Sequence, residues 1–84
     1  MSITEEIKYK LQSLEPTLIE LEDESSLHAG HRGNGGGGHF KLTITSPRFN
    51  QVPPVMRHRM VYEALNDLFP SKIHALSIRA QSTN

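Results

Sequence analysis

Histidines are the residues of this chain best suited to chemistry. Three of the five, His28, His31 and His39, lie in or beside the stretch that also holds all six glycines. Neutral imidazole binds zinc, copper and iron, and it titrates near neutral pH. The spacing of three between His28 and His31 would let both rings reach one ion. An exposed polar loop can equally hold histidines that bind nothing, so spacing alone leaves both interpretations open.

The remaining histidine positions favour structural roles when judged by pattern alone. His39 begins a predicted strand on its polar side, which favours a solvated surface residue and leaves it as a reserve ligand. His58 lies near the apolar edge of a predicted helix, where its ring could pack on a sheet. His74 shares the strand parity of Leu76 and Ile78, which predicts a half-buried packing residue.

Composition excludes several kinds of site. The chain has no cysteine, so it forms no disulfide and no iron–sulfur or zinc site from its own thiolates alone. Nine basic residues balance nine acidic ones, so any attraction to nucleic acid must be local. The Gly35 to Gly38 run lacks the lysine and the following helix of a phosphate-binding loop, and neither a zinc-hydrolase motif nor a nucleophile elbow occurs. We therefore predict a protein that is not an enzyme.

Length and hydropathy predict one small domain, residues 1–84, because a chain of 84 residues has room for one modest core. The first residues lack the apolar core of a signal peptide. No run approaches the roughly 20 apolar residues that cross a bilayer. We expect a cytoplasmic protein with no membrane partner.

Hydrophobic periodicity predicts five elements around the histidines. Ser2 and Glu5 have the spacing of a capping box and begin an amphipathic helix that ends before Pro16. Alternating or apolar runs predict three strands, and a second helix is stopped by Pro70. The predicted ranges are strands at 18–24, 39–46 and 73–79 and the second helix at 55–69. Between the first two strands we predict a flexible glycine-rich loop, 25–38, and after the last strand a frayed tail, 80–84.

These elements predict an α/β (α+β) fold, a small two-layer domain in the order helix, strand, strand, helix, strand. A three-stranded mixed sheet with both helices on one face is the simplest arrangement that buries all the apolar stripes.

A series of short motifs covers nearly the whole chain and resembles the BolA family, whose fold is a small α/β domain similar to a class II KH module. The motifs are Asp23-Glu24-Ser25 before His28-Ala29-Gly30-His31, His39-Phe40-Lys41-Leu42-Thr43-Ile44 with Ser46, Arg48-Phe49, Arg57-His58-Arg59-Met60-Val61-Tyr62, and Ile73-His74-Ala75-Leu76-Ser77. Each motif alone is weak, and the series together is specific.

The resemblance implies a monothiol glutaredoxin as partner and a bridging [2Fe-2S] cluster used in iron–sulfur trafficking or iron regulation. It implies that His74 is one ligand and that a loop residue, His28 with His31 as the alternative, is the second. A partner cysteine and a glutathione thiolate would bind the other iron, so no cluster is expected in the isolated protein. Such a site should have a raised reduction potential and weaken in acid, because imidazole must be neutral to bind iron.

A second role implied by the resemblance is DNA-binding transcriptional regulation. The basic residues Arg48, Arg57, Arg59 and Lys72 could form a local patch, although the segment before the long helix lacks the Gly-x-x-Gly turn of KH modules. The competing interpretation is a solvated face with ordinary ion pairs. Alone, the protein is expected to be a monomer or a weak homodimer.

Overall fold

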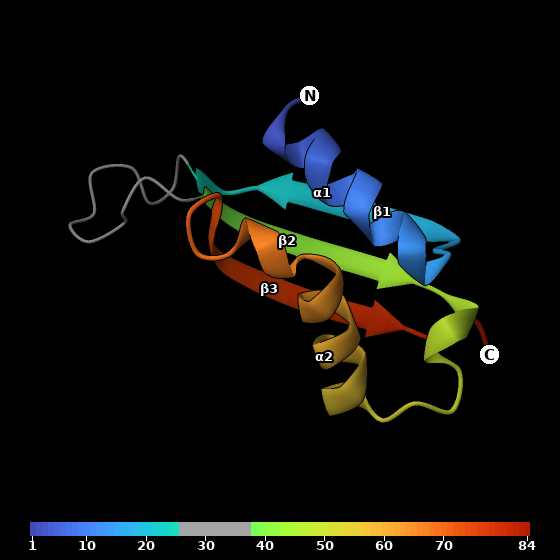
Figure 1. Ribbon diagram of the computed structural model, residues 1–84. Helices are drawn as coiled ribbons and strands as arrows, with labels where there is room; N and C mark the ends of the chain where they lie inside the picture. Colours follow the sequence, from blue (N-terminus) through green and yellow to red (C-terminus); the bar gives the residue numbers. More distant parts are fainter. Residues whose placement is uncertain (26–37) are drawn as a thin grey trace.

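The computed structural model describes residues 1–25 and 38–84, and these form two helices packed on a three-stranded sheet (Figure 1). The main elements are α1 (Ile3–Leu11), β1 (Leu18–Asp23), β2 (Gly38–Thr45), α2 (Pro54–Ala64) and β3 (Ile73–Gln81). Short 3₁₀ helices in the described residues also connect them: η1 (Gln12–Leu14), η3 (Pro47–Phe49) and η4 (Asn66–Leu68).

The sheet has the order β1-β2-β3, with β1 antiparallel and β3 parallel to β2. Both helices cover the same face, and the other face is open (Figure 1). A parallel β2–β3 pair needs a crossover, which the segment containing α2 provides. The predicted mixed sheet and two-layer fold are confirmed.

The core lies between the helices and the covered face of the sheet. The side chains of β2 alternate, with Phe40, Leu42 and Ile44 buried and the intervening residues facing the open side. The other buried apolar residues come from both helices, the 3₁₀ segments and the first residue of β3: Ile7, Leu11, Leu14, Phe49, Val61, Leu65, Leu68 and Ile73. In the described parts of the chain no helix is long and apolar enough to span a bilayer.

Helix ends follow the capping signals of the sequence. The Ser2 hydroxyl accepts a hydrogen bond from the Glu5 amide at 3.2 Å, and α1 gives way to η1 before Pro16. The second helix is shorter than the predicted range 55–69. It begins with Pro54, ends at Ala64, and continues as η4 after a break at Leu65.

The last strand is longer than predicted. The Gln81 carbonyl accepts a hydrogen bond from the Ser46 amide at 3.0 Å, so β3 extends two residues beyond Arg79. The Thr83 amide donates to the Asn50 side chain at 2.9 Å. The expectation of a tail frayed from residue 80 is therefore wrong, because these contacts with the β2–α2 connection hold the end of the chain. The predicted loop 25–38 falls mostly outside the described residues.

Candidate functional site at the end of the open sheet face

An irregularity in the β2–β3 register determines where His74 lies. Gly38 pairs with Ile73, whereas His39 pairs with Ala75, so β3 has one extra residue at His74. Such a bulge reverses the inside–outside alternation on one side of it. Ile73 is therefore fully buried and His74 is exposed. The packing role predicted for His74 from strand parity is wrong.

The bulge brings the His74 ring beside His39 at the end of the open face. The two ring centroids are 5.2 Å apart, with an angle of 41° between the ring planes. His39 is half-buried and His74 is exposed. Two imidazoles from neighbouring strands thus lie together where a partner can reach them.

Backbone hydrogen bonds fix the position of His39. Its amide donates to the Ser25 hydroxyl at 3.0 Å, and its carbonyl accepts from the Glu24 amide at 2.7 Å. Hydrogen bonds from the Ser25 hydroxyl and amide hold the pKa of the Asp23 carboxyl below its usual range. These hydrogen bonds connect the end of β1 to the start of β2, so both strands determine the position of the His39 backbone.

A hollow of about 300 Å³ adjoins the histidine pair, with Glu24, His39, Ala75 and Ser77 in its lining. Among the residues described, no three histidine, aspartate or glutamate side chains cluster closely enough to hold a metal ion. The described residues thus bring together two imidazoles, fewer than the ligands that a metal centre normally needs.

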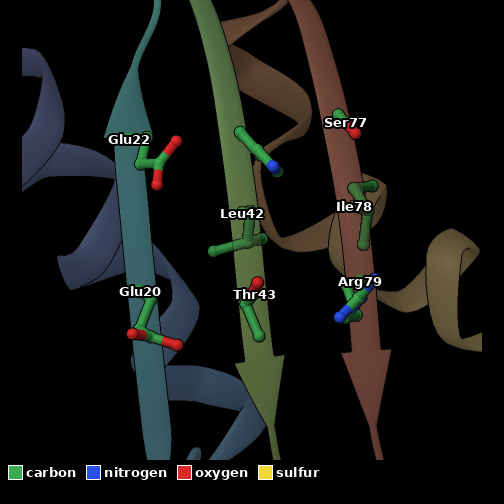
Figure 2. A pocket seen from close by; sticks show the side chains of 8 residues that line it. Glu20, Glu22, Leu42, Thr43, Ser77, Ile78 and Arg79 are labelled. Carbon is green, nitrogen blue, oxygen red and sulfur yellow. The ribbon is translucent and has the colours of Figure 1, made fainter.

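Farther along the open face, a shallow groove of about 350 Å³ runs across all three strands (Figure 2). Charges of both signs line it: Glu20, Glu22, Lys41 and Arg79, with Thr43 and Ser77 between them. Within residues 1–25 and 38–84 the ion pairs are Lys10–Asp67, Glu15–Arg48 and Glu6–Lys72, so none joins these groove residues. The two carboxylates and the two cations balance, so the groove carries no excess of positive charge that would attract a polyanion.

The predicted loop ligands His28 and His31 lie outside the described residues. His58 is exposed on α2, so the sheet-packing role predicted for it is wrong. Sequence reasoning ranked His39 only as a reserve ligand. Its place on the polar side of β2 was readable from alternation, but its nearness to His74 depends on a bulge that alternation does not reveal.

The four basic candidates for DNA binding do not gather into one patch. Arg48 pairs with Glu15 at 3.3 Å, and Lys72 pairs with Glu6 at 3.1 Å. Arg48 follows the end of β2, whereas the Lys72 carbonyl bonds the Gly38 amide at its start, so the two lie at opposite ends of that strand.

The other two basic candidates lie on α2. The Arg57 guanidinium donates to the carbonyls of Val52 and Ala80 at 2.6 and 3.1 Å, which is a structural role. Arg59 is exposed.

Comparison with known proteins identifies the family. Residues 11–84 match the family model described as BolA, BolA-like protein. The chain is 40% identical over 77 residues to BolA-like protein 1 of Mus musculus, covering 90% of this chain and 55% of that protein. It is 38% identical over 79 residues to the DNA-binding transcriptional regulator BolA of Haemophilus influenzae, covering 93% and 75%.

A solved structure gives the same result. The BolA domain of SufE1 from Arabidopsis thaliana superposes with a TM-score of 0.83 at 40% identity, over 99% of this chain and 95% of that one. The chain spans only 22% of the SufE-like protein 1, chloroplastic/mitochondrial, of the same plant and about half of the mouse relative. On sequence and fold together, this chain belongs to the BolA family.

Proposed function

We propose that this BolA-family domain is a non-catalytic adaptor that docks a monothiol glutaredoxin and shares a bridging [2Fe-2S] cluster with it. The proposal depends above all on one observation, the adjacent imidazoles of half-buried His39 and exposed His74. His74 is the fixed ligand. The second imidazole comes either from His39, its neighbour in the described structure, or from His28 or His31, the positions that the family resemblance implies.

The separation of the two rings fits a shared metal ion. A metal–nitrogen bond of about 2.1 Å and a tetrahedral ligand angle place two imidazole centroids roughly 5 Å apart. The His39 and His74 centroids are 5.2 Å apart. The backbone contacts of His39 with Ser25 and Glu24 would orient one ring, and the bulge would orient the other.

The incomplete donor set supports sharing rather than a resident metal. The chain has no cysteine, and the described residues hold no group of three potential ligands. A [2Fe-2S] cluster needs four protein or thiol ligands. Two would therefore have to come from a partner, as a glutaredoxin cysteine and a glutathione thiolate would supply. When bound, the cluster would be cargo, and neutral imidazole ligands would leave it with less negative charge than four thiolates.

The test is to titrate the protein into a glutaredoxin loaded with its cluster and to follow visible absorption and circular dichroism. Ligand exchange should change both spectra, and His74→Ala should reduce the change, because one of the two imidazole ligands is lost. His58→Ala is the matched control, because His58 is exposed on α2, away from the pair. Spectra that stay unaltered at saturating wild-type protein would refute the proposal. Comparing His39→Ala with His28→Ala and His31→Ala identifies the second ligand.

DNA-binding regulation is the second candidate, because relatives from Haemophilus influenzae and Vibrio cholerae, each 38% identical to this chain, are named DNA-binding transcriptional regulator BolA. Its test is a salt titration of binding to duplexes of different sequence. A regulator should prefer one sequence and lose affinity steeply as salt rises. Equal affinity for all duplexes would rule out specific regulation.

The cytoplasmic location stays a prediction, since two Arabidopsis relatives carry organelle names.

A further inference from the structure

The strand β3 forms one edge of the sheet (Figure 1). In an edge strand, the backbone groups of alternate residues point away from the sheet. The Gln81 carbonyl bonds the Ser46 amide on the β2 side. The backbone N–H and C=O groups of successive residues in a strand point to opposite sides within the plane of the sheet. Since those of Gln81 point toward β2, those of Leu76, Ile78 and Ala80 point away from β2, to the open edge.

Both ends of this edge are closed to a new strand. At one end, the Arg57 guanidinium donates a hydrogen bond to the Ala80 carbonyl at 3.1 Å. At the other end, the bulge at His74 interrupts regular pairing. The window between them contains the backbone N–H and C=O groups of Leu76 and Ile78, and no hydrogen bond from any described residue reaches them. The window is symmetric about Ser77.

The two edges of the sheet differ in charge. The other edge strand, β1, carries Glu20 and Glu22 at alternate positions, and Glu24 directly follows it, so two copies paired there would bring carboxylates together. The β3 window instead combines half-buried Leu76 and Ile78 on the helix side with Ser77 on the open side. No acidic residue lies in β3.

We propose that a second copy of this chain pairs antiparallel with the β3 edge, centred on Ser77, to give a continuous six-stranded sheet with all helices on one face. Leu76 and the partner's Ile78 exchange two hydrogen bonds, and symmetry doubles them to four. The same residues form apolar cross-strand contacts on the helix side. On the open side Ser77 meets the partner's Ser77, and Ala75 meets the partner's Arg79, so no like charges face each other. This inference is independent of the proposed function.

Few hydrogen bonds and a small apolar contact predict a weak dimer that forms only at high protein concentration. A register-specific cross-link tests the geometry, because the chain contains no cysteine of its own. Directly opposed residues in a non-hydrogen-bonded antiparallel pair have Cα atoms about 4.5 Å apart, within disulfide range. Ser77→Cys should therefore cross-link readily under mild oxidation.

Ala75→Cys is the matched control, because Ala75 is exposed on the same strand and the same face. In the proposed register two introduced cysteines at 75 are offset by four residues, or roughly 13 Å. We expect the Ser77→Cys protein to cross-link at least tenfold faster at equal concentration. Equal rates for the two variants, or no cross-link in either, would overturn the proposal.

A charge-complementation experiment tests the same axis without a covalent bond. In sedimentation equilibrium the unmodified protein should dimerise toward about 1 mM, whereas Ser77→Lys and Ser77→Glu should each remain monomeric. Mixing the two variants in equal amounts should restore dimers, since the introduced charges would then be opposite. Because Ser77 is exposed, neither substitution should disturb the fold, and circular dichroism checks that both variants are folded. The proposed dimer is refuted if the mixture stays monomeric like the single variants, or if the wild type is monomeric at every concentration.

Discussion

Replacing Arg57 by alanine tests whether this residue is part of the fold or of a nucleic-acid surface. Its guanidinium joins the segment before α2, through the Val52 carbonyl, to the edge of β3, through the Ala80 carbonyl. Hydrogen bonds from a charged donor contribute about 1.5–3 kcal/mol each. Because Arg57 is only half-buried and water can replace part of the loss, we expect Arg57→Ala to cost about 2–3 kcal/mol in total.

For a domain of this size, 1 kcal/mol shifts the melting temperature by about 4–8 °C, so the loss should be plain in thermal unfolding followed by circular dichroism. Arg59→Ala is the control. Arg59 is exposed two residues away on the same helix, and its replacement should change stability by less than about 0.5 kcal/mol. Arg57→Lys keeps the charge but loses the planar fork, so an intermediate result is expected.

An Arg57→Ala protein that unfolds with the same midpoint as the wild type would show that Arg57 does not stabilise the fold. If that variant kept full stability and instead lost DNA affinity selectively, Arg57 would belong to a nucleic-acid surface, as the basic-patch interpretation supposed.

Two further perturbations follow from the described contacts. Ser46→Ala should cost about 1–3 kcal/mol in urea unfolding, because the fully buried hydroxyl donates to the Leu14 carbonyl and accepts from the Arg48 amide. Ser13→Ala, which removes an exposed hydroxyl, should cost less than about 0.5 kcal/mol, and equal losses for the two would contradict the assignment. The lowered pKa of Asp23 means that its carboxylate stabilises the fold above its ordinary pKa of 3.8 and that this stability is lost as pH falls through the folded-state value. The stability difference between wild type and Asp23→Asn should therefore shrink below about pH 4, and a difference that is constant down to strong acid would show that the Ser25 hydrogen bonds do not favour the charged form.

Local signals in the sequence predicted most of the fold. The Ser2 cap, the stop at Pro16 and the alternation of β2 each depend on residues close together in the chain, and the structure places all three as expected. The length of β3 was underestimated because its end is held by Ser46 and Asn50, which are distant in sequence. Local composition cannot reveal such contacts.

The site was less predictable than the fold, for the same reason. Strand parity placed His74 on the covered side with Leu76, and one extra residue in β3 reverses that assignment. The bulge arises from how β3 meets Gly38 across the sheet, so it is a tertiary feature. Arg57 illustrates a similar limit: its charge predicted a surface role, whereas in the fold it donates hydrogen bonds to two backbone carbonyls.

The most direct test of the proposed cluster sharing is pulsed electron paramagnetic resonance on the reduced complex with a cluster-loaded glutaredoxin. Nitrogen atoms bound to iron give strong hyperfine couplings that thiolate ligands cannot produce. We predict couplings from two histidine nitrogens in the wild-type complex and the loss of one in His74→Ala. A reduced complex without any strongly coupled nitrogen would contradict the account, even if the two proteins bound each other tightly.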